Sequence, residues 1–297
     1  MLVPSLPSDK LLWHYTSMPV LQKVIEEAQL HATNIRYMND AGEFKDARGL
    51  LTSCIQSVRV ATDSRGETWH RALWRTIWDN LLSWGGIEYP PEVYVTCFSG
   101  VANQLSQWRA YCRPGPGVAI GFDAEVLIRA IDTSEWRLVR CQYPSPLRQR
   151  QEIEEMLSGL VDARQGELYQ RGVAEGPERE AVVIDIARDV WARFEEIAVR
   201  NKHMGFAEEQ EYRLVASRLG GLDPRAVVKP RNGTLIPYLP LKFSTAPESM
   251  PIKRIWIGPV TDVEWRDLHL HAIHVLQFAN RLEPLDIRYS ETPLRDT

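Results

Sequence analysis

Residues 206–215, Phe-Ala-Glu-Glu-Gln-Glu-Tyr-Arg-Leu-Val, place three carboxylates and an arginine at the start of a predicted strand. Side chains alternate between the two faces of a strand, so we expect Glu209, Glu211 and Arg213 on the same face. Two carboxylates this close repel each other unless a cation, a sugar hydroxyl or a developing positive charge lies beside them. The alternative interpretation is an exposed edge strand on which Arg213 pairs with a carboxylate for little net energy.

This strand must find its partners elsewhere in the chain. Further strand patterns lie at residues 11–15, 30–33, 93–99, 117–122, 136–143, 235–241 and 252–257. Helical periodicity is expected near residues 18–28, 40–60 and 68–84, and almost continuously from 147 to 201 with breaks at Gly172 and Gly176. We therefore predict a single α+β domain over residues 1–297, with a mixed or antiparallel sheet, peripheral helices and a helical insertion at residues 147–201.

The composition excludes several classes of protein. A content of 44% hydrophobic and 25% charged residues is ordinary for a chain that buries a core. The net charge of -4 argues against a broad nucleic-acid-binding surface. It does not exclude a local basic groove formed by Arg137, Arg140, Arg148 and Arg150. No apolar run approaches the ~20 residues of a membrane helix, and the start of the chain does not resemble a signal peptide. We expect a cytoplasmic protein with no membrane partner.

The cysteines and histidines favour neither a disulfide framework nor a zinc site. The four cysteines, Cys54, Cys97, Cys112 and Cys141, show no CxxC spacing and are interpreted as buried, reduced thiols. Three histidines cluster at residues 269–274 without an acidic or cysteine partner at ligand spacing, so we predict no metal site there. The sequence also has no GxGxxG motif, no P-loop and no nucleophile elbow.

A second polar and aromatic cluster, Trp13-His14-Tyr15-Thr16-Ser17, lies on the first predicted strand. A ring nitrogen of His14 could donate to a ribose hydroxyl, although a single histidine on a strand is more often a core residue. Together with the carboxylates, this cluster supplies what a site for breaking the nicotinamide–ribose bond of NAD needs. That reaction develops positive charge on the ribose, and we assign its stabilisation to Glu211. Glu209 would orient the acceptor or assist in removing its proton.

Two further segments carry candidate ligand contacts. Residues 36–44 form a polar loop that runs into a helix N-terminus, where Arg36 and the following amides could hold a pyrophosphate. Capping alone would explain Asp40 and Glu43 in this loop. Residues 107–111, Gln-Trp-Arg-Ala-Tyr, offer the aromatic faces of Trp108 and Tyr111 for stacking on nicotinamide or on a target base.

Two other functions compete with this hypothesis. The first is a metal-dependent nuclease in which Glu209, Glu211 and Asp40 or Glu43 hold Mg²⁺. The residues that follow Glu211 are Tyr212 and Arg213, so the lysine that commonly completes such a site is missing from the motif. The second is a binding module without catalysis, in which the same strand makes only ion pairs.

Several of these motifs resemble a bacterial family catalogued as domain of unknown function 2971. The resemblance rests on residues 14–17, 36–44, 97–99, 107–111, 117–122, 205–213 and 255–259, in the same order along the chain. More distantly, the chain is similar to the ADP-ribosyltransferase superfamily, whose toxin members open with a His-Tyr-Thr strand and end with a catalytic glutamate. This similarity implies an ADP-ribosyltransferase-like fold and an NAD-dependent transferase or NAD glycohydrolase, as in a toxin or a phage-defence effector.

The same similarity implies roles for individual residues. It places His14 against the nicotinamide ribose, Glu211 in the position of the catalytic glutamate, and either Tyr37 or Tyr111 against nicotinamide. The residues expected to contact NAD, which would be a substrate, are Tyr15, Thr16, Arg36, Tyr37, Asn39, Asp40, Ser99, Trp108, Tyr111 and Arg213. The acceptor of ADP-ribose could be a protein, a nucleic acid, a small molecule or water, and the sequence does not indicate an oligomeric state.

Overall fold

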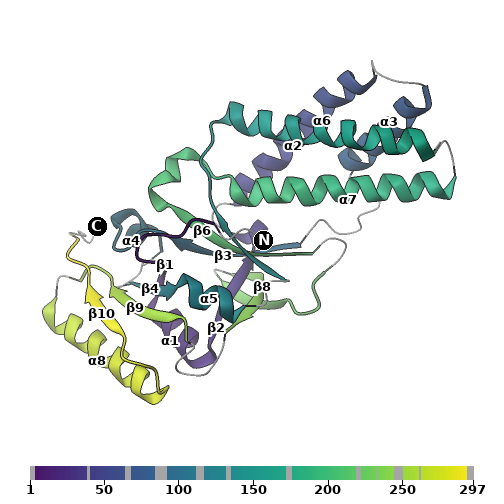
Figure 1. Ribbon diagram of the computed structural model, residues 1–297. Coiled ribbons are helices and arrows are strands. Elements are labelled where there is room, and N and C mark those ends of the chain that lie inside the picture. The colour runs from purple at the N-terminus through teal and green to yellow at the C-terminus, as the bar shows by residue number, and fades with distance from the viewer. Residues whose placement is uncertain are drawn as a thin grey trace.

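The computed structural model describes residues 4–292 apart from 39–40, 64–67, 84–91, 112–116, 132–134, 172–175, 219–221, 232, 244–249 and 261. In these residues the protein is an α+β fold built on a mostly antiparallel open sheet, which confirms the predicted fold class. Its helices form two groups, one around the sheet and one in a bundle to one side of it (Figure 1).

The sheet joins segments that are far apart in the chain. The strands are β1 (Leu11–Ser17), β2 (Gln29–Asn34), β3 (Glu92–Ser99), β4 (Gly117–Asp123), β5 (Trp136–Arg140), β6 (Glu211–Arg218), β7 (Val227–Arg231), β8 (Thr234–Lys242), β9 (Ile252–Ile257) and β10 (Asp286–Tyr289). The main path runs β10-β9-β4-β1-β3-β2-β8-β7, while β6 pairs with both β3 and β5. Among the described strands, only β9 and β10 pair in parallel.

The helices around the sheet are α1 (Met18–Glu27), α4 (Leu105–Tyr111), α5 (Ala124–Ala130) and α8 (Val263–Ala279). The bundle consists of α2 (Ala41–Asp63), α3 (Thr68–Ser83), α6 (Pro146–Arg171) and α7 (Pro177–Arg200), and two short 3-10 helices are η1 (Ile35–Tyr37) and η2 (Met204–Glu209). The helical segment expected at residues 147–201 is therefore formed by α6 and α7. These helices pack with α2 and α3, so the bundle draws on two separate stretches of chain (Figure 1).

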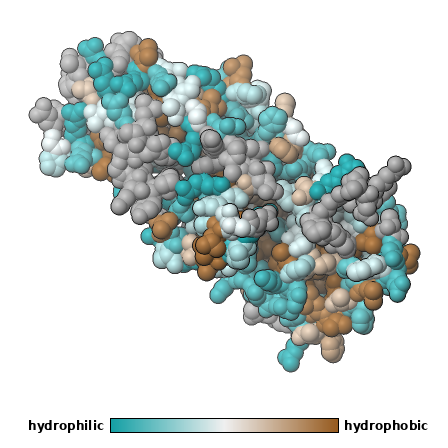
Figure 2. Space-filling view, turned by 180° about the vertical axis from the view of Figure 1, so that it is seen from behind, coloured by the Kyte–Doolittle hydropathy of each residue, from teal (hydrophilic) through white to brown (hydrophobic). Residues whose placement is uncertain are grey.

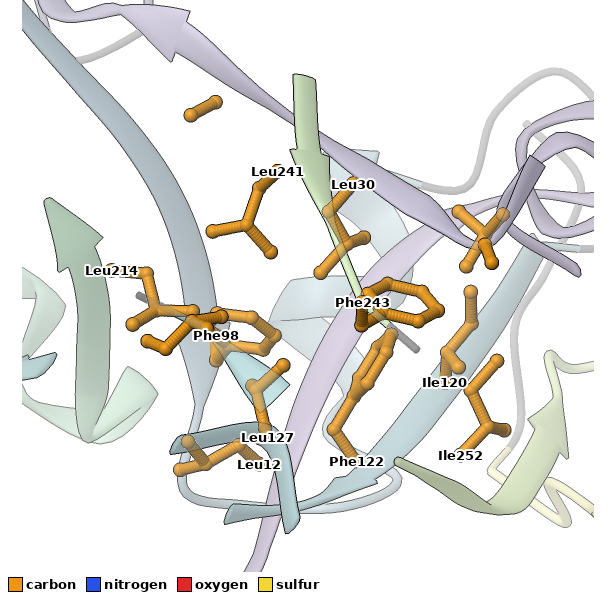
Figure 3. Packing of buried hydrophobic residues seen from close by; sticks show 14 of the residues in the cluster. Leu12, Leu30, Phe98, Ile120, Phe122, Leu127, Leu214, Leu241, Phe243 and Ile252 are labelled. Atoms are coloured by element: carbon orange, nitrogen blue, oxygen red, sulfur yellow. The ribbon is translucent and has the colours of Figure 1, made fainter. Parts of the chain in front are cut away.

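Two apolar cores lie on opposite faces of the central strands. On β6, Val215 packs with the bundle, whereas its neighbour Leu214 packs on the other side with Phe98 and Phe122. This is the alternation that a strand imposes. Figure 3 shows side chains from several strands converging in the second core. In the first core Trp74 and Trp78 stack with ring centroids 5.2 Å apart and are almost fully buried, so they are packing residues.

Apolar residues also remain at the surface, over the C-terminal helix α8. Figure 2 shows apolar side chains gathered at the end of the molecule that carries α8. Trp265, Leu268, Val275 and Phe278 are exposed on this helix, while Ile273 is buried in the second core. Helix α8 therefore has one face on the core and a second, partly apolar face in solvent.

The sheet divides where β1 meets β3. Strand β1 pairs with β4 along its whole length, from Leu11 opposite Asp123 to Ser17 opposite Gly117. Against β3 it pairs at the single position Trp13–Ser99, whereas β3 continues along β6 for eight residues. The two strands separate beyond this point, and a cavity lies between them.

The carboxylate segment departs from its prediction at one position. Strand β6 begins at Glu211, and Glu209 is the last residue of η2 rather than part of the strand. Gln210 separates them in the left-handed region, with φ of 44°, so an extended chain cannot continue through it. The prediction that Glu209 shares a strand face with Glu211 and Arg213 is wrong, although the two carboxylates still meet through their side chains.

Candidate functional site

The cavity between β1 and β3 has a volume of 510 Å³. Its walls come from β1, β2, β3, β7, α1 and α4, with η2 and the start of β6 at one end. Among the predicted site residues, His14, Tyr15, Thr16, Ser99, Tyr111, Glu209 and Glu211 line it. Strand pairing thus brings together residues from four separate regions of the chain. The volume is within the range of small-molecule sites, roughly 300–1,000 Å³.

A buried lysine joins the two carboxylates. The Lys202 ammonium lies 2.7 Å from Glu209 Oε2 and 2.7 Å from Glu211 Oε2, and it also sits over the Phe206 ring at 4.8 Å. Lys202 is 1% exposed, so these contacts replace its hydration. The cation that two adjacent carboxylates require is therefore supplied by the protein itself. Sequence reasoning missed Lys202 because it lies on an irregular segment seven residues before Glu209.

Backbone hydrogen bonds fix the segment that carries Lys202. Asn201 forms a parallel bridge with Gln142, just after β5. Lys202 N donates to Gln142 O at 2.9 Å, and Gln142 N donates to Arg200 O at 2.8 Å. Because β5 is itself paired with β6, the segment of Lys202 and the strand of Glu211 are held by one connected set of backbone pairings.

Glu211 is held as an anion by several donors. Arg213 Nε donates to Oε1 at 2.7 Å and Arg213 Nη2 to Oε2 at 3.3 Å, while the Cys97 thiol also hydrogen-bonds this carboxylate. Burial would raise the pKa of Glu211, but Arg213 and Lys202 together lower it to about 2. With Lys202, these donors occupy the roughly four acceptor positions of a carboxylate. Glu211 thus provides a fixed negative charge at the cavity wall.

Glu209 is held at the edge of the cavity. The Ser99 hydroxyl lies 2.7 Å from the Glu209 carbonyl oxygen, and Gly100 N donates to Gln210 O at 3.0 Å. A Cβ at Gly100 would lie 3.1 Å from the same Gln210 oxygen, so glycine allows this close approach of the two backbones. Ser99 therefore positions Glu209 through the backbone as well as lining the cavity.

The His14 ring bridges the point where β1 leaves β3. Its Nδ1 lies 2.9 Å from the Cys97 carbonyl oxygen, which only accepts hydrogen bonds, so we assign the proton to Nδ1. Burial lowers the pKa of His14, the bond to Cys97 raises it and the charge on Lys229 lowers it further, so the ring is neutral. In this tautomer Nε2 is an acceptor, and it would receive a hydrogen bond from a ligand hydroxyl rather than donate one.

The aromatic residues next to His14 are used partly in packing. Tyr15 OH donates to Val101 O and accepts from Gln104 N, each at 3.0 Å, which fixes the turn between β3 and α4. Trp108 is fully buried, lies edge-on to the Tyr15 ring at 4.8 Å and donates Nε1–H to Asn103. Trp108 is therefore a core residue in this conformation, because no face of its ring is open to a ligand.

The two candidate stacking tyrosines occupy different places. Tyr111, at the end of α4, lines the cavity, whereas Tyr37 is exposed outside it. Arg36 also lies outside the lining, and its guanidinium pairs with the buried Glu92 at 2.5 Å. Arg213 is 3% exposed and turned to Glu211 and the Val199 carbonyl. Asn39 and Asp40 lie outside the described residues.

The cavity also contains polar residues that the sequence did not indicate. Thr96 is 2% exposed, and within the described residues its hydroxyl has no hydrogen-bond partner. At the end formed by β7 and α1, the cavity is lined by Lys23, Lys229 and Arg231. Strand β7 was not expected because its five residues show no alternating burial and include Pro230. Its cations could not be connected to His14 without the sheet order.

The arrangement offers hydrogen bonding and fixed charge more readily than a metal site. The described residues contain no cluster of three or more His, Cys, Asp and Glu side chains able to hold a metal ion. Cys54 and Cys141 are buried, as predicted, while Cys97 is half-buried and Cys112 lies outside the described residues. Within the same residues, no helix combines the length and apolar character needed to cross a membrane.

Comparison with known proteins supports the family resemblance. The family model described as "Protein of unknown function (DUF2971)" matches residues 107–214. This stretch begins in α4 and ends in β6, so it contains Tyr111, Lys202, Glu209 and Glu211. No curated protein and no solved structure matches the chain.

Proposed function

We propose that the protein cleaves the nicotinamide–ribose bond of NAD and transfers ADP-ribose to an acceptor. The observation that carries this proposal is the convergence of His14, Tyr111, Glu209 and Glu211 on one cavity from distant segments. Thr96 adds support, because its buried hydroxyl has no hydrogen-bond partner among the described residues. Such a group costs about 1–3 kcal/mol of stability, which a hydrogen bond to a ligand hydroxyl would recover.

In the proposed reaction, the bond between the nicotinamide nitrogen and ribose C1′ breaks, and its electron pair leaves with nicotinamide. An acceptor oxygen or nitrogen then bonds to C1′ and loses a proton. Glu211, ionised and immobile, would stabilise the positive charge on the ribose. Its acceptor positions are largely filled by protein donors, so Glu209, at 9% exposed, would make the contact with the acceptor.

The first test measures nicotinamide released from NAD by purified wild type, Glu211→Gln and Glu209→Gln. We expect Glu211→Gln to abolish release and Glu209→Gln to reduce transfer more than NAD hydrolysis. Glu208→Gln is the matched control, because Glu208 is an exposed carboxylate in the same 3-10 helix. Circular dichroism of each variant separates loss of chemistry from loss of fold.

Unchanged nicotinamide release in a folded Glu211→Gln variant would reject this assignment. The resemblance to toxin members of the superfamily also supports a role as a toxin or phage-defence effector. In that case, induced expression of the wild type in bacteria arrests growth and expression of Glu211→Gln does not. Equal growth with both proteins would argue against the toxin role.

A metal-dependent nuclease is the second candidate, and Lys202 is the observation that favours it. The lysine that the motif lacks lies beside both carboxylates in space. However, its ammonium occupies the position between them where a cation would otherwise sit. A nuclease would degrade DNA or RNA with Mg²⁺, lose this activity in EDTA and ignore NAD. Absence of nucleic-acid cleavage with Mg²⁺ would eliminate it.

A further inference from the structure

The end of the cavity formed by β7 and α1 has a charge opposite to that of the glutamates. Lys229 and Arg231 are two apart on β7, so they project from the same face of the strand. Lys23 approaches from α1, and all three residues line the cavity. Glu27 is the acidic side chain in this part of the lining, and it is hydrogen-bonded by Gln29. The positive charges therefore outnumber the negative ones here.

Among the described residues, Lys23, Lys229 and Arg231 form no ion pair with a carboxylate. Burial lowers the pKa of Lys229, and the neighbouring charges of Arg231 and Lys23 lower it further. Arg36, which the sequence suggested as a phosphate ligand, differs in this respect because Glu92 already neutralises it.

The position of Lys229 is fixed by two aromatic neighbours. Its ammonium lies 3.1 Å from His31 Nδ1 and 5.0 Å from the centroid of the Tyr238 ring, on which His31 also packs at 4.0 Å. Burial and the charges on Lys229 and Lys23 lower the pKa of His31 to about 4, against a smaller opposing effect of Glu27. A neutral His31 accepts a hydrogen bond from the ammonium. Lys229 is thus held in place before any ligand arrives.

This cationic end is continuous with the His14 end. The positive charge of Lys229 lowers the pKa of His14, so the electrostatic effect of Lys229 extends to the imidazole where β1 and β3 separate. His14 in turn bonds the Cys97 carbonyl, and the Cys97 thiol bonds Glu211. A single ligand in the cavity would therefore meet cations at one end and carboxylates at the other.

We propose that Lys229, Arg231 and Lys23 form a subsite for the diphosphate of a nucleoside-diphosphate ligand, with the rest of that ligand extending toward His14 and Glu211. Adjacent phosphates need several donors with positive charge, and the three cations at this end of the cavity provide them. For NAD this inference rests on the proposed function, because it assigns the part of the cavity that binds the two phosphates. The proposal that this subsite binds ADP does not depend on any cleavage of NAD.

The test is calorimetric binding of ADP and of adenosine to the full chain. We expect ADP to bind much more tightly than adenosine, and Lys229→Met to weaken ADP binding about tenfold or more. Lys242→Met is the control, because Lys242 is an exposed lysine of β8 outside the cavity lining. The dependence of ADP affinity on salt should also become shallower in Lys229→Met.

Equal affinities for ADP and adenosine, or equal ADP affinities of wild type and a folded Lys229→Met variant, would overturn the subsite. Arg231→Gln, at an exposed position, is the second variant if Lys229→Met does not fold. The outcomes separate the two proposals. If ADP binds through Lys229 but nicotinamide is never released, the subsite stands and NAD cleavage fails. If nicotinamide is released with the same KM for NAD in Lys229→Met, cleavage stands and the subsite is wrong.

Discussion

The two ends of the cavity handle charge in opposite ways. At the glutamate end, Lys202 and Arg213 meet Glu209 and Glu211 in a buried group with no net charge. At the β7 end, Lys229 and Arg231 face the same cavity without a carboxylate partner in the described residues. Neutralised charges hold a local structure together, whereas charges left without partners raise the free energy of the protein until a ligand binds. Mutations at the glutamate end are therefore expected to lower stability as well as catalysis, whereas mutations at the cationic end are expected to lower ligand affinity with little change in stability.

The largest effect is expected from Lys202→Met. Removing the ammonium leaves Glu209 and Glu211 buried and facing each other, which should lower the free energy of unfolding by about 3–5 kcal/mol. Urea denaturation measures the change. Adding Glu209→Gln to Lys202→Met should restore part of the loss, because only one carboxylate then stays ionised. A change no larger than that of the exposed control Lys242→Met would show that Lys202 is not holding the pair.

The next effect is on the pH dependence of stability. The pKa of Glu211 is lowered from its usual value of 4.5 to about 2, so its ionised form contributes stability above pH 4.5 that disappears as the pH falls toward 2. The difference in urea midpoint between wild type and Glu211→Gln should therefore shrink in this window. A difference that stays constant between pH 4.5 and 2 would mean that Glu211 has no strong cationic partners in the folded state.

A smaller effect is expected from Tyr111→Ala. This substitution removes an aromatic face from the cavity wall, so the KM for NAD should rise about two- to tenfold while the fold stays intact. Tyr37→Ala is a matched control, since both tyrosines are exposed but Tyr37 does not line the cavity. If Tyr37→Ala raised the KM and Tyr111→Ala did not, the stacking role would pass to Tyr37.

The smallest change in stability is expected from Lys229→Met. The folded protein lowers the pKa of Lys229, so the charged form is disfavoured relative to the unfolded chain, and this cost is present while the lysine is protonated. Removing the charge should change the free energy of unfolding by less than about 1 kcal/mol, in the stabilising direction or not at all. A loss comparable to that of Lys202→Met would contradict the contrast between the two ends of the cavity.

Most of the regular elements could be predicted from local patterns. The continuous apolar runs of β3 and β4 and the helical periodicity of α3 and α7 depend on neighbouring residues, so the sequence contains the necessary information. Strand β7 and the short strand β10 were not predicted, because neither has a buried face that would give an apolar pattern. The left-handed backbone conformation of Gln210 also could not be recognised from the sequence. For this reason the strand was expected to include Glu209, whereas β6 begins two residues later, at Glu211.

The sequence indicated an α+β fold and placed His14 and Glu211 on strands, as the structure has them, but it assigned Glu209 to the wrong element. The sequence did not show that Lys202, Lys229 and Arg231 lie near the predicted site residues. It also did not show that Arg36 and Trp108 lie outside the cavity lining. Those facts depend on strand order and on contacts between residues tens to more than a hundred positions apart, as when His14 bonds Cys97. Local propensities act over a few residues, whereas the sheet order and the pairing of buried charges are settled by the packing of the whole chain.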